Sequence, residues 1–167
     1  LISIVLPGDI DSCIELLEFL YPLVLEITDV KFTIIHHPEI IKYTLRIADK
    51  ITELKNCNNS YSNSDELFIK SKALISYGTS AIIQGMLNSC FILVPVMSRS
   101  LPLDPAFNKI DSVDYVVDKK IMSESIKKLI LLKEAPDKLS KQYNDTKKYL
   151  KFKNKKLYLS DLASYSL

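Results

Sequence analysis

One of the three glycines in this 167-residue chain opens a turn that could hold a phosphate. Gly78 ends the apolar run ALISY and precedes Thr79 and Ser80, and either hydroxyl could cap a following helix. The first N–H groups of such a helix, with the positive end of its dipole, attract anions. Gln84 lies about one turn further and could reach a ribose hydroxyl. The stretch also fits a capped helix that binds nothing, and it is neither a G-x-G-x-x-G fingerprint nor a P-loop.

The only two histidines, His36 and His37, follow a second apolar run and precede Pro38. An imidazole at a strand end can donate to a phosphate oxygen or protonate a leaving phosphate. Both histidines are therefore candidate phosphate ligands. The alternative is that one packs in the core while the other is solvated. Two histidines do not make a multi-histidine metal site, so no metal is expected.

Four further residues are weaker candidates. Gly8 and Asp9 follow the first apolar run, where Gly8 permits a turn and Asp9 could simply cap the next helix. Arg99 could pair with phosphate in a bidentate manner, or it could be a solvated loop residue. Asp104, in the same loop, could hold a sugar hydroxyl.

The elements that must position these residues alternate between strands and helices. Short, continuous apolar runs predict buried strands at 2–7, 31–38, 73–77, 90–96 and 114–118. Helices are predicted at 9–27, from 38, and at 64–71, 79–89, 123–132 and from 136. Pro22 should kink or shorten the first helix, and Gly85 should let its helix pack close to a strand. The polar segment 55–66 is expected to be a surface loop that holds at most a very short strand.

This alternation predicts an α/β fold: a Rossmann-like, doubly wound, mainly parallel sheet of about five strands, with helices on both faces and a C-terminal helical tail. In such sheets, ligands lie outside the carboxyl ends of the strands, where the strand order reverses. Gly8, the two histidines and Gly78 should therefore share one edge. A receiver-type domain fits less well, because Asp9, Asp11 and Lys119 only loosely imitate its acidic cluster and lysine.

The composition, 47% hydrophobic and 25% charged, is close to the average for soluble globular proteins. A formal net charge of +2 gives no argument for nucleic acid, which is not expected as a partner. No apolar run is long enough to span a bilayer, and no secretory signal is visible. Three widely spaced cysteines form no disulfide framework, which indicates a reducing, cytoplasmic location. Leu1 already lies in a strand-like run, so we expect a piece of a longer protein.

The order of these motifs resembles the C-terminal half of GT-B glycosyltransferases. A strand ends in His37-Pro38, and some forty residues later a strand leads through Gly78-Thr79-Ser80 into a helix and another apolar strand. The resemblance is strongest to the bacterial surface-polysaccharide group, which includes capsule and lipopolysaccharide sialyltransferase-like enzymes and glycerophosphate transferases that use CDP-glycerol. Its patterns run near K-x-H-P and S-x-G-T/S-S-A-x-x-E-A, and the element order matches over 1–132.

The resemblance implies that residues 1–135 bind the nucleotide of an activated sugar or polyol, linked to CMP, CDP or UDP, without a cofactor. The acceptor site and the general base would belong to an N-terminal domain that these 167 residues do not include. His37 is implied as the catalytic residue at the phosphate. The resemblance also implies that Thr79 and Ser80 contact the phosphate and that Gln84 faces the ribose. From their places at the strand ends, Gly8, His36 and Gly78 are further expected phosphate contacts, and Glu39 is an expected ribose or sugar contact.

The sequence departs from the family pattern at several positions. Ile35 stands where the family often has Lys, and Gln84 replaces the usual Glu. Ser89 and Phe91 stand where Gly and Pro are common. Three functions therefore stay open: the donor-binding half of a transferase, a nucleotide-sugar epimerase of the same architecture, and a non-catalytic module that binds a phosphorylated ligand or a protein.

Residues 136–167 form a second segment, a basic helical extension. From 138 to 156 it has eight lysines and one acidic residue, with Tyr143, Tyr149, Leu150 and Phe152 interleaved. Such a helix could pack its apolar side on the domain or on the missing N-terminal half. It could also lie on an anionic membrane, which would place the protein at the inner face of the membrane.

Overall fold

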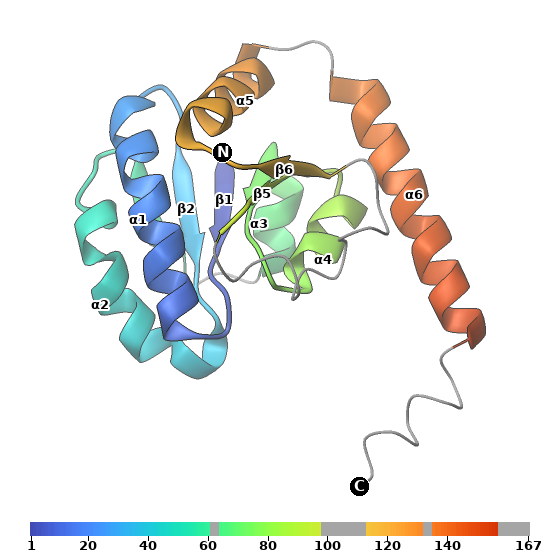
Figure 1. Cartoon of the computed structure of the whole chain (residues 1–167), viewed down its shortest axis with the longest axis horizontal. Coiled ribbons are helices and arrows are strands. Elements are labelled where there is room, and N and C mark those ends of the chain that lie inside the picture. Colours follow the sequence, from blue (N-terminus) through green and yellow to red (C-terminus); the bar gives the residue numbers. More distant parts are fainter. Residues whose placement is uncertain (61–63, 98–112, 132–134, 157–167) are drawn as a thin grey trace, which may run out of the picture.

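Six parallel strands form one sheet in the residues that the computed structural model describes, which are 1–60, 64–97, 113–131 and 135–156 (Figure 1). Their order is β3-β2-β1-β4-β5-β6. The chain therefore runs outward from β1 to β3, returns to the other side of β1, and runs outward again to β6. The order reverses between β1 and β4, which is the switch point of a doubly wound fold. The strands are β1 (Ile2–Val5), β2 (Phe32–Ile35), β3 (Cys57–Ser60), β4 (Ala73–Ile75), β5 (Phe91–Pro95) and β6 (Asp114–Val116).

The helices form two groups that cover opposite sides of the strands (Figure 1). In one group α1 packs against α2 and α5, and in the other α4 packs against α3 and α6. The α/β prediction is confirmed, and the sheet has one strand more than expected. The helices are α1 (Ile10–Glu26), the short 3-10 helix η1 (Pro38–Ile40), α2 (Ile41–Thr52), α3 (Ser64–Lys70), α4 (Ala81–Leu87), α5 (Lys119–Leu131) and α6 (Ala135–Lys156).

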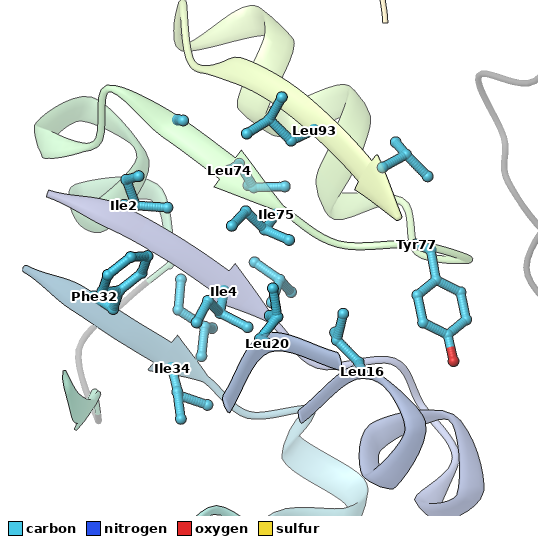
Figure 2. Packing of buried hydrophobic residues seen from close by; sticks show 14 of the residues in the cluster. Ile2, Ile4, Leu16, Leu20, Phe32, Ile34, Leu74, Ile75, Tyr77 and Leu93 are labelled. Carbon is cyan, nitrogen blue, oxygen red and sulfur yellow. The ribbon is translucent and has the colours of Figure 1, made fainter. Parts of the chain in front are cut away.

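The core lies between the sheet and these helices, and Figure 2 shows the part of it beneath α1. Ile4 and Ile34, on neighbouring strands, face Leu16 and Leu20 of α1, and all four side chains are fully buried. Every residue of β1, β2, β4 and β5 is buried. The continuous apolar runs in the sequence follow from this, because a parallel strand covered on both faces has no solvent side.

The sequence made one prediction for Pro22 in α1 and one for Gly85 in α4, and the structure agrees better with the second. Pro22 does not shorten α1, which continues to Glu26. Pro22 is exposed, and so is Glu18, whose carbonyl loses its helical partner. Gly85 does let α4 approach the sheet: a Cβ built there would lie 3.0 Å from Cδ1 of Leu74 and 3.0 Å from Cδ1 of Ile92.

Helix α6 packs on the domain through two buried polar side chains. Gln142 Nε2 donates to the carbonyl of Cys90 at 2.9 Å, and Thr146 Oγ1 donates to the carbonyl of Gln142 at 2.7 Å. Thr146 Oγ1 also lies 3.2 Å from Sδ of Met86 in α4. Helix α6 is thus packed on the sheet-bearing part of the chain. No helix among the described residues is both long and apolar enough to cross a bilayer.

All three thiols are buried. Cys13 Sγ donates to the carbonyl of Pro7 at 3.4 Å, and Cys90 Sγ to that of Phe68 at 3.1 Å. Burial raises the pKa of Cys13 to about 12, that of Cys57 to about 11 and that of Cys90 to about 12. They act as small core side chains and not as nucleophiles.

Candidate functional site

The sheet register brings the three candidate turns to one edge. Val5 lies level with Ile35, and Ile4 lies level with Ile75. The pairing extends one residue further, because the N–H of Leu6 donates to the carbonyl of Ile35 at 3.0 Å. The turns after β1, β2 and β4 therefore begin within one or two residues of one another along the strand direction. This is the carboxyl edge of the sheet, on both sides of the switch point.

Gly8 and His37 lie against each other at this edge. A Cβ built on Gly8 would lie 3.6 Å from both Cδ2 and Nε2 of His37. His37 is half-buried, and its Nδ1 is buried without a hydrogen-bond partner. Its Nε2 is not among the buried unpartnered atoms of the described residues. Because a buried N–H without an acceptor is unfavourable, the proton of the neutral ring belongs on Nε2.

His36 has a different environment, and both of its ring nitrogens have partners within the chain. Nδ1 lies 2.8 Å from Oγ1 of Thr44, and Nε2 lies 2.8 Å from Oδ1 of Asn59. The residue is 7% exposed, and burial lowers its pKa, while the hydrogen bond that Nε2 donates to Asn59 Oδ1 acts in the opposite direction. His36 therefore joins β2 to α2 and β3, and its contact with phosphate stays a prediction. One histidine of the pair is buried, and the other is half-buried.

Gly78 provides the backbone geometry expected of it. Its φ is 64°, in the left-handed region where a side chain is strained. The chain can therefore leave β4 and enter α4 within a few residues. Thr79 accepts the first hydrogen bond of the helix, from the N–H of Ala81 to Oγ1 at 3.3 Å.

The expected row of unpaired N–H groups in α4 is partly wrong. The N–H of Ile82 donates to the carbonyl of Thr79 at 3.3 Å, and that of Ile83 donates to the carbonyl of Ser80 at 3.0 Å. The side chain of Ser80, by contrast, makes no capping hydrogen bond and is exposed. The hydroxyl of Ser80, and not the first turn of α4, is therefore the better candidate to contact a ligand here.

Gln84 lies on the same side of α4 as Ser80. The two residues are four apart, and both are exposed, whereas Ala81, Ile82, Gly85 and Met86 are buried. A ligand that reached Ser80 would therefore pass near Gln84. Glu39 is also exposed, in η1, immediately after His37 and Pro38.

The remaining candidates have a structural role or cannot be placed. Asp9 is the N-cap of α1, where Oδ1 accepts from the N–H of Ser12 at 2.8 Å. Arg99 and Asp104 lie outside the described residues.

Sequence reasoning missed two residues that hold the turn after β4 in place. Ser76 Oγ donates to the carbonyl of Val5 at 2.7 Å, and Tyr77 Oη donates to the carbonyl of Ser12 at 2.9 Å. Tyr77 is 1% exposed, and burial raises its pKa to about 12. Figure 2 shows its ring beyond the end of β4, on the side of α1. A tyrosine inside an apolar run was the available signal, because a buried phenol needs a hydrogen-bond partner.

Two cavities in the described residues lie away from this edge. One of about 280 Å³ lies between α1 and α2, and one of about 420 Å³ lies between α1 and α5. Neither is lined by a candidate site residue. The described residues contain no group of three His, Cys, Asp or Glu side chains that could hold a metal ion.

Comparison with known proteins gives matches to solved structures alone. No family model and no curated protein sequence matches the chain. The C-terminal CMP-Kdo binding domain of WaaA from Acinetobacter baumannii matches with a TM-score of 0.62 at 12% identity, over 89% of this chain and 88% of that one. The glycotransferase of kitacinnamycin matches with 0.60 at 12%, over 89% of this chain and 39% of that one. The GtfA/B complex matches with 0.53 at 10%, over 88% and 32% respectively.

At these low identities the structural matches show the fold alone, and it is the fold that the sequence motifs led us to expect. The chain is similar in extent to the WaaA domain, and it spans about two-fifths and one-third of the other two chains.

Proposed function

We propose that this chain, which has the fold of a GT-B C-terminal domain, is the donor-binding half of a glycosyltransferase or glycerophosphotransferase. The observation that carries the proposal is His37, whose ring lies against Gly8 at the switch-point edge with Nδ1 buried and unpartnered. Because Gly8 has no side chain, the backbone of this turn can approach a ligand that contacts the imidazole. The N–H at Nε2 is the group that would meet it.

The chemistry assigned to this edge is stabilisation of a leaving phosphate. In transfer from a nucleotide-linked sugar, the bond between the sugar carbon and the phosphate oxygen breaks, and negative charge develops on that oxygen. The N–H of His37 and the hydroxyl of Ser80 would donate hydrogen bonds to the phosphate. These hydrogen bonds lower the reaction barrier most if they strengthen as the negative charge grows. Gln84 would accept or donate at a ribose hydroxyl. The acceptor and the general base would come from another domain.

The class of activated donor follows from the matched structures and the sequence motifs together. The WaaA domain binds CMP-Kdo, so CMP is the first nucleotide to test, with CDP and UDP beside it. A role in bacterial surface-polysaccharide synthesis is the setting that the motif resemblance supports.

Isothermal titration of CMP, CDP and UDP into the chain tests the proposal. We expect at least one nucleotide to bind, and His37→Ala and Ser80→Ala each to weaken it about tenfold, the loss of one hydrogen bond to a charged group. Ser140→Ala, an exposed serine in α6, is the matched control and should bind as the native chain does. Absence of binding by all three nucleotides, or affinities unchanged in both site variants, would contradict this assignment.

A non-catalytic module is the second candidate, and Ile35 favours it. Ile35 stands where the family often has Lys, and it is buried in β2, so it brings no charge to the phosphate. Nucleotide binding that depends on His37 and Ser80, without turnover when the full-length protein is assayed, would support that reading.

A further inference from the structure

Positive charge in this chain is concentrated in α6. Residues 138–156 hold eight of the 22 Lys and Arg and one of the 20 Asp and Glu, so this stretch carries +7 and the rest of the chain −5. The 22-residue helix is about 33 Å long. In Figure 1 it runs along one side of the molecule, outside α4. The small net charge of the whole chain is thus the sum of a strongly basic stretch and an acidic remainder.

The two faces of α6 have different roles. Gln142 and Thr146 are 1% and 0% exposed and join the helix to the domain. Lys141, Lys147 and Lys148 are exposed. The sequence presents packing on the domain and binding to a membrane as alternatives for this helix. In the structure the face that packs on the domain is not the face that carries the exposed lysines.

We propose that the lysine face of α6, defined by Lys141, Lys147 and Lys148, binds an anionic lipid surface. Basic residues close to such a surface each contribute to binding, and the contribution falls off within about 8 Å at physiological ionic strength. A helix with its side chains is about 10 Å wide. The sheet and the other described helices lie on the other side of α6, so their acidic residues stay largely beyond that range when the lysine face touches the surface.

The composition of this face favours lipid over nucleic acid. Neither of the two arginines, Arg46 and Arg99, lies in α6, although arginine is the usual residue for bidentate contacts to phosphate and bases. Tyr143 is half-buried, and Lys147 Nζ lies 4.3 Å from its ring centre, so this ring does not offer a platform for stacking bases. Ammonium groups on flexible stems suit a surface of many headgroups without fixed geometry.

Co-sedimentation of the full 167-residue chain with vesicles tests the proposal. We expect binding to phosphatidylcholine vesicles that contain phosphatidylserine, none to phosphatidylcholine alone, and weaker binding as salt is raised. Lys141→Gln, Lys147→Gln and Lys148→Gln together should lower the partition coefficient about a hundredfold, at about fivefold for each lysine. The affinity of this triple variant for nucleotide should not change. Failure of the lipid proposal can therefore be told apart from failure of the proposed nucleotide site.

The matched control removes the same charge elsewhere. Lys31, Lys55 and Lys70 are exposed and lie outside α6, and their triple Gln variant should keep most of the vesicle binding. Equal loss in both triple variants would reduce the effect to net charge and overturn the assignment to α6. Equal binding to neutral and anionic vesicles would also overturn it, as would tighter α6-dependent binding to an oligonucleotide at the same salt.

Discussion

His36 and His37 are neighbours in the chain, yet one is buried in the interior and the other is half-buried at the carboxyl edge of the sheet. Successive residues at a strand end point to opposite sides, so a pair must divide in this way. Which one is buried depends on Thr44 and Asn59, whose side chains meet the two nitrogens of His36. These two partners belong to α2 and β3, so the sequence of the pair alone does not show which histidine is buried.

The buried histidine should make stability depend on pH. Because burial lowers the pKa of His36, the unfolded chain binds its proton at a higher pH than the folded chain does. This contribution to the free energy of unfolding is complete above the unfolded value of about 6.5 and is lost as pH falls below it, with a slope of at most about 1.4 kcal/mol per pH unit. Urea unfolding of the native chain and His36→Gln between pH 7.5 and 5 measures it. An identical pH slope in both proteins would show that His36 does not titrate as proposed.

At the scale of elements, the close approach of α4 to the sheet depends on one missing side chain. Gly85 lies in a helix interior, where glycine is unfavourable by about 1 kcal/mol relative to alanine. Its position is explained by Leu74 and Ile92, whose Cδ1 atoms occupy the space that a Cβ would need. Packing across this contact thus outweighs helix propensity.

Overpacking at this position should be costly. Gly85→Val would force the buried side chains of Leu74 and Ile92 apart, and we expect a loss of about 1–3 kcal/mol in the free energy of unfolding. Gln84→Val is the control, because it introduces the same side chain at the exposed neighbouring position of α4. Chemical denaturation of both variants gives the comparison. Equal stability of the two would mean that the contact at Gly85 is looser than the structure shows.

Two elements, β3 and α5, were predicted only in part, for different reasons. Strand β3 is built from CNNS, and asparagine is depleted in strands. It pairs with β2, where Thr33 Oγ1 donates to Asn58 Oδ1 at 3.0 Å, and Asn59 Oδ1 lies 2.8 Å from Nε2 of His36, directly after β2. Helix α5 begins at Lys119, four residues before the predicted start. There a local signal existed, since Asp118 Oδ1 accepts from the N–H of Ile121 at 2.8 Å.

At the scale of the whole molecule, alternation of apolar runs and helices was enough to predict the parallel sheet, its helical layers and the edge where a ligand should bind. Residue roles at that edge were less predictable, because they depend on contacts between turns. Gly78 was recognisable, because glycine adopts a φ such as the observed 64° most readily. The partner of Tyr77 was not, because the carbonyl of Ser12 is 65 residues away in the chain.

The central strands should be the most stable part of the molecule. Strands β1 and β4 are paired on both sides, whereas β3 and β6 are edges with partly exposed residues. We expect amide hydrogen exchange to be slowest in β1 and β4 and to become faster toward both edges. Ile4 and Ile75 should be protected up to global unfolding, and Asn59 should exchange earlier. Equally slow exchange in β3 and β1 would contradict this order.

The burial of all three thiols has a practical consequence for observing the molecule at work. With pKa values raised to about 11 and 12, Cys13, Cys57 and Cys90 remain protonated and covered at neutral pH. A maleimide dye would therefore find a single cysteine introduced at an exposed position while the native ones stay in place. A fluorophore at Gln84→Cys would sit beside the proposed nucleotide, and one at Asn144→Cys would report on α6 as vesicles are added.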